Sequence, residues 1–60
     1  MKKVYRQLVV LESGEYQRAY VNTTKTAEQL GEQVWNETED IFLVEIREDH
    51  GTDYYIRNVK

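Results

Sequence analysis

Three carboxylates and the single histidine of this chain fall within one short segment near its end, where they could coordinate a divalent cation. They are Glu48, Asp49, His50 and Asp53. Their spacing matches neither the loop typical of Ca²⁺ sites nor the patterns typical of Zn²⁺ sites. We therefore interpret the segment as a polar hairpin turn around Gly51 and predict no metal site.

Nucleophilic catalysis finds little support in the rest of the sequence. The chain has no cysteine, and its only serine, Ser13, belongs to a predicted turn. A general base needs a nucleophile at a fixed place, and His50 has no evident partner of that kind. We therefore expect a protein that is not an enzyme and uses no cofactor.

Aromatic and basic side chains offer a different chemistry, the stacking of nucleic-acid bases beside cations. Phosphate neutralisation supplies most non-specific affinity for nucleic acids, yet this chain has 8 basic against 11 acidic residues. A nucleic-acid-binding or transcription-regulatory protein with a tyrosine-lined sheet face is therefore an alternative, not the first expectation. Its platform would comprise Tyr5, Tyr16, Tyr20, Tyr55, Arg6, Arg18 and Arg57.

Acidic residues dominate the middle of the sequence. Residues 28–53 carry nine acidic side chains against one basic side chain, Arg47, whereas residues 1–27 carry five basic against two acidic. A solvated helix face with acidic loops would give this pattern, and so would a surface that attracts a basic protein. For the second case we predict an acidic belt, with a tryptophan that either anchors the partner or packs on the sheet. This acidic belt comprises Glu28, Glu32, Glu37, Glu39, Asp40 and Trp35.

Alternating apolar runs on both sides of one amphipathic segment predict the elements that position these residues. Runs at 3–12 and 16–22 flank a turn at Ser13 and Gly14, and runs at 41–47 and 53–59 flank a second turn. Between the two pairs, Thr26 and Gln29 match a capping box for a helix that extends to residue 36. Gly31 in the middle of this helix indicates close packing on a sheet.

The order of the strands follows from which of them are apolar on both faces. Residues 8–11 and 41–46 have this character, which is typical of central strands. We predict an α+β fold, ββαββ, with a four-stranded antiparallel sheet in the order 2-1-3-4 and one helix packed on one face. Residues 1–60 then form a single small domain.

One short helix can cover only one face of such a sheet. If the side chains under the helix are those of Leu8, Val10, Phe42, Val44 and Ile46, a second apolar face stays bare and is expected to be an interface. A slip of one residue would exchange the two faces. Because small chains without disulfides often rely on self-association, we expect a homodimer or another partner here. The predicted sheet-face interface comprises Tyr5, Val9, Leu11, Ile41, Leu43 and Tyr55.

Residues 24–31, followed by Ile41 to Leu43 and a hairpin with a glycine, are similar to part of the lambda Cro repressor family. The similarity covers the helix before the turn of its helix-turn-helix and its final hairpin. Residues 32–40 are too few and too acidic for a recognition helix. No base-reading residue carries over, and we assign the chain to no family.

The start of the chain bears on location. Met1, Lys2 and Lys3 are followed by an apolar run of only residues 8–11, shorter than the 7–15 or so residues of a signal peptide. No segment approaches the roughly 20 apolar residues of a membrane span. We expect the sequence to be a complete reading frame of a microbe, phage or mobile element. Its product is expected in the cytoplasm of the microbe or of a host cell. We predict a small acidic protein-binding module or inhibitor that occludes a basic partner surface, or else a structural homodimer.

Overall fold

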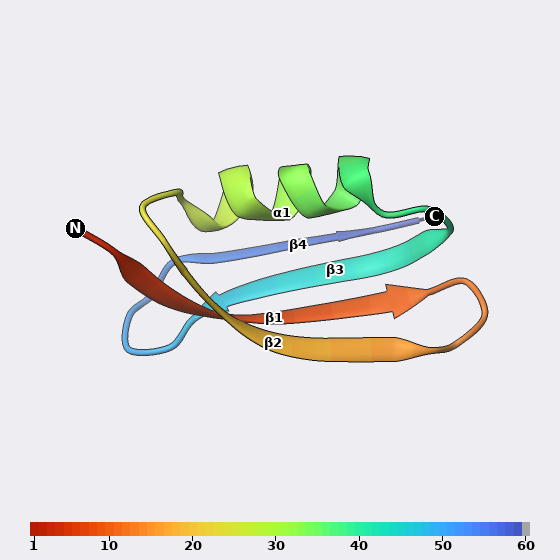
Figure 1. The fold of residues 1–60 in the computed structure, drawn as a ribbon, viewed down its shortest axis with the longest axis horizontal. Coiled ribbons are helices and arrows are strands. Elements are labelled where there is room, and N and C mark those ends of the chain that lie inside the picture. Colours follow the sequence, from red (N-terminus) through yellow and green to blue (C-terminus); the bar gives the residue numbers. More distant parts are fainter. Residues whose placement is uncertain (60) are drawn as a thin grey trace.

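The computed structural model describes residues 1–59 and places one helix across a four-stranded antiparallel sheet (Figure 1). Strands β1 (Lys3–Leu11) and β2 (Tyr16–Thr23) precede helix α1 (Ala27–Glu37), and strands β3 (Ile41–Glu48) and β4 (Tyr54–Asn58) follow it. The strands lie in the order β2-β1-β3-β4, and every neighbouring pair is antiparallel. The predicted fold and strand order are therefore confirmed.

Helix α1 begins where its sequence provides a cap. Thr26 Oγ1 accepts a hydrogen bond from the backbone N–H of Gln29 at 3.1 Å, and Gln29 Oε1 accepts one from the N–H of Thr26 at 3.0 Å. This reciprocal pair is the predicted capping box. Asp53, just before β4, accepts a further bond from the N–H of Ala27 at 2.8 Å. The start of the helix is thus tied to the C-terminal hairpin.

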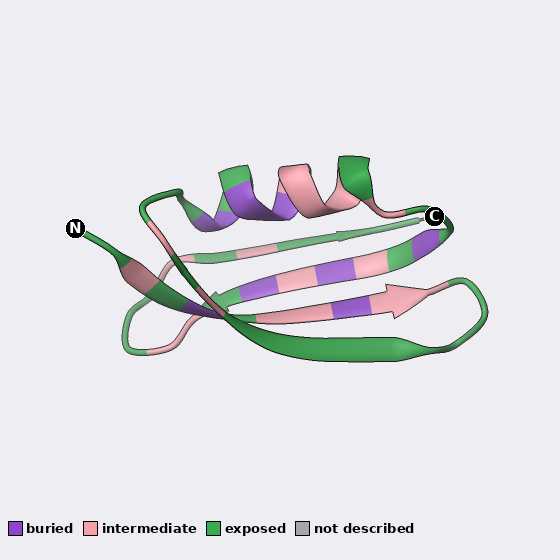
Figure 2. Cartoon of the chain, viewed as in Figure 1, coloured by how far each residue is buried: buried purple, intermediate pink, exposed green. Residues whose placement is uncertain are grey.

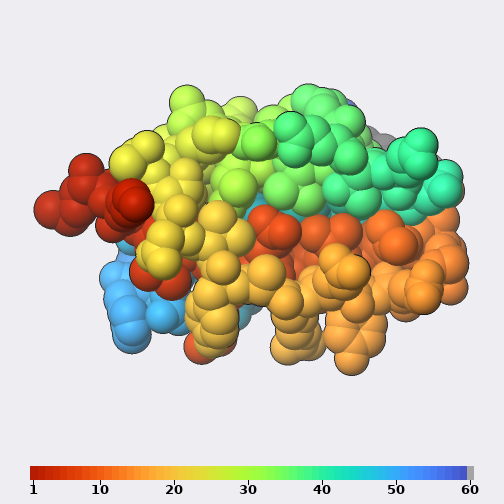
Figure 3. Space-filling model, viewed as in Figure 1, coloured from red at the N-terminus to blue at the C-terminus, as the bar shows by residue number. Residues whose placement is uncertain are grey.

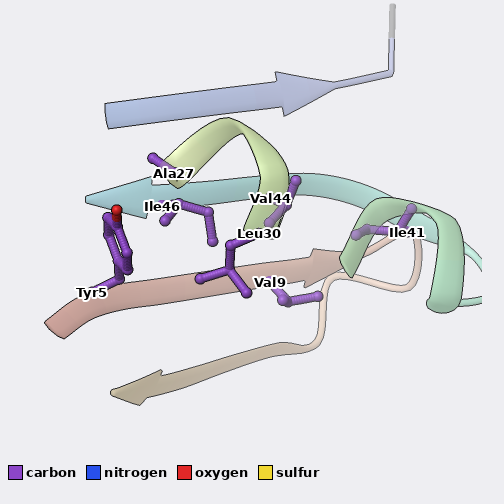
Figure 4. Packing of buried hydrophobic residues seen from close by; sticks show 7 residues of the cluster. All are labelled: Tyr5, Val9, Ala27, Leu30, Ile41, Val44 and Ile46. Carbon is purple, nitrogen blue, oxygen red and sulfur yellow. The ribbon is translucent and has the colours of Figure 1, made fainter. Parts of the chain in front are cut away.

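The core lies between α1 and the two central strands. Val9 of β1 stands directly opposite Val44 of β3, and both are buried. Figure 4 shows the cluster, and Figure 2 shows that β2 is exposed along most of its length. The contacts of α1 fall on β3 and β4. The buried apolar residues are Tyr5, Val9, Ala27, Leu30, Ile41, Val44 and Ile46.

Gly31 brings the helix close to the sheet. A Cβ atom added at this position would stand 2.7 Å from Cε2 of Tyr55 and 3.4 Å from Cγ1 of Ile46. Carbon atoms in contact normally lie about 3.5–4.0 Å apart. The prediction that Gly31 marks close helix–sheet packing is therefore confirmed.

The prediction of which face the helix covers is right for Val44 and Ile46 of β3, which are buried, and wrong for β1, for β4 and for the first residues of β3. Leu8 and Val10 were expected under the helix, but the register places them on the opposite, uncovered face. Phe42 was also expected in the core and is 44 % exposed. Of the predicted sheet-face interface, Leu43 alone lies on the uncovered face. The other five lie on the helix side, in the core or packed against it: Tyr5, Val9, Leu11, Ile41 and Tyr55.

Strand pairing explains why the covered and uncovered faces of β1 are the reverse of those predicted. Residues of β1 are apolar at odd and even positions alike, so alternation within the strand does not select a face. Pairing does select one, because Val9 stands opposite Val44 and therefore shares its side of the sheet. The register shifts between Val10 and Leu11, and this irregularity brings Ile41 into the core beside Val44.

No helix within residues 1–59 has the length and apolar character needed to cross a membrane.

Candidate binding face

The uncovered face of the sheet presents three rows of side chains that run across all four strands. Each row follows from the residues paired directly across neighbouring strands. We call this surface the grid face. From β2 to β4, its rows are Tyr20, Arg6, Arg47 and Tyr54; then Arg18, Leu8, Glu45 and Ile56; then Tyr16, Val10, Leu43 and Asn58.

The first row brings two arginines together at its centre. Arg6 and Arg47 stand directly opposite each other on the central strands, an arrangement of like charges that destabilises a sheet. Each has a carboxylate nearby: Arg6 Nε lies 3.1 Å from Asp49 Oδ1, and Arg47 Nη2 lies 3.6 Å from Glu45 Oε2. Rules of local stability are most often broken where a surface serves binding. The opposed arginines therefore make this row a candidate binding site.

Each tyrosine of the grid face lies beside an arginine. The guanidinium carbon lies 6.0 Å from the ring centre in the pair of Arg6 with Tyr20. It lies 5.9 Å away in the pair of Arg47 with Tyr54. Such exposed cation–π pairs contribute about 0.5–1 kcal/mol each. The third pair is Arg18 with Tyr16, and the three rings are between 48% and 69% exposed. These rings therefore offer apolar area at the surface instead of filling the core.

A shallow hollow of about 310 Å³ lies on the grid face. Three arginines and one glutamate contribute to its lining, so its local charge is positive although the whole chain carries −3. Planar guanidinium groups bind carboxylates and phosphates through paired hydrogen bonds. The charged lining residues are Arg6, Arg18, Arg47 and Glu45. The grid face can therefore hold an anionic group beside apolar contacts.

The residues predicted as a nucleic-acid platform are divided between the two sides of the sheet. Tyr16, Tyr20, Arg6 and Arg18 do share the grid face. Tyr5, Tyr55 and Arg57 lie on the helix side instead. Arg47 and Tyr54 also belong to this face, although the platform predicted from the sequence did not include them. Their positions follow once Val44 and Ile46 are known to be buried, since alternation then sends Arg47 outward.

Two members of the predicted acidic belt are part of the folded framework. Arg57 Nη1 lies 2.8 Å and 2.9 Å from the two carboxylate oxygens of Glu32, and the Tyr55 hydroxyl also donates to Glu32. These bonds, that of Tyr55 first, hold the pKa of Glu32 below its ordinary value. The Arg57 guanidinium also covers the ring of Trp35 at 4.7 Å, and this ring packs against the core. Trp35 is thus half-buried on the sheet.

The other members of the belt are exposed but not contiguous. Glu28 lies in the first turn of α1, whereas Glu37 ends the helix about 14 Å further along its axis. Glu39 and Asp40 follow directly, and the carbonyl of Asp40 accepts a hydrogen bond from the N–H of Glu12 at 2.8 Å. Negative charge therefore gathers at the end of the molecule where α1 stops.

The charged residues of the final turn interact with one another and with β1. Asp49 binds Arg6, and its other oxygen lies 3.3 Å from His50 Nε2. Glu48 accepts a hydrogen bond from the backbone N–H of Asp53 at 3.2 Å. Within residues 1–59, no three His, Cys, Asp or Glu side chains are grouped so as to hold a metal ion.

Asp53 has a structural role that the sequence analysis did not find. Its Oδ2 accepts hydrogen bonds from the Tyr5 hydroxyl and the Ala27 N–H, both at 2.8 Å, and Lys3 Nζ lies 3.9 Å away. These bonds, that of Ala27 first, hold the pKa of Asp53 below its ordinary value. Burial first, and Asp53 next, raise the pKa of Tyr5 to about 12. A tyrosine in a buried strand needs a polar partner for its hydroxyl, and this requirement could have pointed to a partner such as Asp53 from the sequence.

Comparison with protein-family models, with curated proteins and with solved structures found no match to this chain.

Proposed function

We propose that this chain is a non-enzymatic protein-binding module that docks through the grid face and occludes the surface it covers. The observation that carries the proposal is the gathering of exposed apolar side chains on one face. Four of the eight large apolar side chains that are exposed among residues 1–59 belong there: Tyr16, Tyr20, Tyr54 and Ile56. Contiguous apolar surface of this kind marks interaction sites, and tyrosine and arginine dominate binding hot spots.

The charges of the grid face favour a partner with carboxylates around an apolar centre. Arg6, Arg18 and Arg47 outnumber Glu45, and guanidinium groups bind carboxylates in a bidentate manner. The third row adds aliphatic area from Val10 and Leu43. This partner differs from the basic surface expected from composition, which stays a prediction for the acidic side of the molecule.

Single-stranded nucleic acid is the second candidate, and the first row of the grid face favours it. Two arginines between two exposed tyrosines resemble the platforms on which bases stack. The aliphatic side chains of the third row are of more use to a protein partner, because bases stack on aromatic rings and not on Val10 or Leu43. The net charge of −3 also opposes a phosphate backbone. We therefore place a protein partner first.

A homodimer formed by two grid faces is less favourable on electrostatic grounds. Each copy would bring three guanidinium groups and one carboxylate to the same interface. Opposing like charges across an interface costs several kcal/mol. The homodimer expected from the sequence stays a prediction, and the charges of this face favour a different partner.

A capture experiment with three forms of the protein tests the proposed face. Leu43→Lys places a charge in the third row, and Asn36→Lys places the same charge on the exposed surface of α1 as a matched control. We expect the wild type and Asn36→Lys to retain the same acidic protein from source cells, and Leu43→Lys to lose it while staying folded by circular dichroism. Retention by all three forms would exclude the grid face as the docking surface.

Nucleic acid is tested separately by fluorescence anisotropy with poly-dT and poly-U, at low and at physiological salt. We expect no binding at physiological salt. Tight binding under both conditions would replace the protein-partner proposal. In that case Tyr20→Ala and Tyr54→Ala should each weaken binding by about 1–3 kcal/mol.

A further inference from the structure

A groove runs along the helix side of the molecule, beside α1 and opposite to the grid face. Because the contacts of α1 fall mainly on β3 and β4, α1 leaves β2 and part of β1 uncovered on this side. The groove has a volume of about 450 Å³, within the range of ligand-binding clefts. Figure 3 shows the side chains of β1, in red, between the green helix and the orange β2.

The lining of this groove is apolar at its base and acidic at one end. Val9 and Leu11 of β1 face Val34 of α1, and all three pack in or against the core. Gln17 of β2 forms part of the opposite wall, where its side chain is exposed. Within residues 1–59, no lysine or arginine contributes to the lining.

The acidic end of the groove is reinforced by its surroundings. Glu37 and Glu39 line it directly, and Asp40 follows them in the chain. Asp40 lies against Glu12 of the turn between β1 and β2, through the hydrogen bond from the Glu12 N–H to its carbonyl. Like charges within the Debye length of about 8 Å at physiological salt add their potentials. This end therefore attracts cations.

We propose that this groove binds a basic amphipathic segment of another protein, with its apolar side chains on the base and its lysines or arginines at the acidic end. Charge complementarity selects this occupant, since an apolar base alone would accept many partners. The groove and the grid face lie on opposite sides of the sheet and carry opposite charge. One chain can therefore hold an acidic partner on one side and a basic segment on the other, and the second site does not depend on the first.

The probe is a fluorescein-labelled helical peptide of leucine and lysine, titrated with the full chain and followed by anisotropy. A second peptide with every lysine replaced by glutamate is the charge control. We expect the basic peptide to bind with an affinity that falls as salt rises, and the acidic peptide not to bind. Glu37→Gln with Glu39→Gln should weaken binding by about two- to fivefold per charge, as expected for exposed ion pairs.

Substitutions at two neighbouring residues of β2 distinguish binding in the groove from a general effect of the net charge. Gln17 and Arg18 point to opposite sides of the sheet because strand residues alternate. Gln17→Glu and Arg18→Gln each change the net charge by −1. We expect Gln17→Glu to strengthen binding of the basic peptide by about two- to fivefold, and Arg18→Gln to leave it unchanged.

Three outcomes would overturn the proposal. Absence of binding to the wild type at low salt would exclude the groove. Equal strengthening by Gln17→Glu and Arg18→Gln would mean that the peptide responds to the net charge alone. The third outcome is self-association of the wild type. If Arg18→Gln abolishes it, and the double variant Glu37→Gln, Glu39→Gln abolishes it too, the occupant of the groove is the grid face of a second copy.

Discussion

Asp53 connects three segments that are distant in the chain. Through one carboxylate oxygen it holds the Tyr5 hydroxyl of β1 and the first N–H of α1, and it stands just before β4. Tyr5 is fully buried, so its hydroxyl needs an acceptor inside the protein. The carboxylate, at 2.8 Å, and the backbone carbonyl of Lys25, at 2.9 Å, both accept from this hydroxyl, and the carboxylate also lies at the positive end of the helix dipole.

Asp53→Asn is expected to reduce the free energy of unfolding by about 1.5–3 kcal/mol near neutral pH, the range for a hydrogen bond to a charged group. The pKa of Asp53 is lower in the folded chain than its ordinary value of 3.8. Its stabilising effect is therefore complete above that value and disappears as the pH falls through the folded pKa. Urea unfolding at several pH values measures the difference between wild type and variant.

That difference should shrink as the solution is acidified below about pH 4. Glu32, whose pKa is also lowered, should account for acid sensitivity that persists in the variant. A constant difference between neutral and strongly acidic pH would contradict the assigned role of the Asp53 charge.

Arg47→Thr should separate stability from binding. The change removes one of two directly opposed guanidinium groups and introduces a β-branched residue suited to a strand. We expect the free energy of unfolding to stay equal or to rise by up to about 1 kcal/mol, while the acidic partner of the grid face is lost. Urea unfolding and the capture experiment report the two effects.

Arg57→Thr is the matched control for this substitution, since Arg57 lies on the helix side of β4 and binds Glu32. It should lower stability and leave capture intact. The reverse pattern in the two variants would show that Arg47 serves the fold and not a partner.

Helix α1 depends on the sheet at three places along its length. The capping box and Asp53 fix its start, Gly31 allows the middle to approach Tyr55, and Arg57 of β4 binds Glu32 and covers Trp35. A helix of 11 residues is too short to be stable alone in water. The helix is therefore stable only when it is docked on the sheet.

Gly31→Ala should destabilise the protein although alanine is the better helix former by about 1 kcal/mol. The added methyl group would collide with the ring of Tyr55. Overpacking of this kind costs about 1–3 kcal/mol, so we expect a net loss in urea unfolding. Asn36→Ala, at an exposed position of α1, is the control and should be neutral or slightly stabilising. An increase in stability for Gly31→Ala would mean that the ring moves aside at little cost.

At the scale of the whole molecule, the grid face and the end where α1 stops carry opposite charge. The grid face gathers arginines, whereas the end of α1 and the adjoining turn gather carboxylates. A chain that buries little surface gains stability from a partner on either side. The separation of charge would restrict such partners to acidic ones at the grid face and basic ones at the end of α1.

Salt should therefore control self-association through the grid face. At physiological salt the opposed arginines of two copies repel each other, so we expect association through this face to be weak in sedimentation equilibrium. High salt screens this repulsion, so any dimer formed through the grid face should become more stable as the salt concentration rises. Leu43→Lys should weaken such a dimer further. A dimer that dissociates as salt rises would instead favour contact between the grid face of one copy and the acidic end of another.

The sequence by itself determined the helix and the four strands, the order of the strands in the sheet, and the close packing of the helix on the sheet. Thr26 and Gln29 fix the helix start because a cap is a local interaction. Two strands that are apolar on both faces must lie at the centre of a sheet, wherever the helix sits. Gly31 was informative because its cost in a helix has to be offset by packing.

Only the tertiary structure decided which face the helix covers and therefore which residues are available to a partner. Alternation tells which residues of one strand share a side, but not which side that is. In β1 both sides are apolar, so the choice depends on pairing Val9 with Val44 across 35 residues of chain. The same pairing brings Arg6 opposite Arg47 on the grid face. Those contacts join distant segments, and no local pattern in the sequence specifies them.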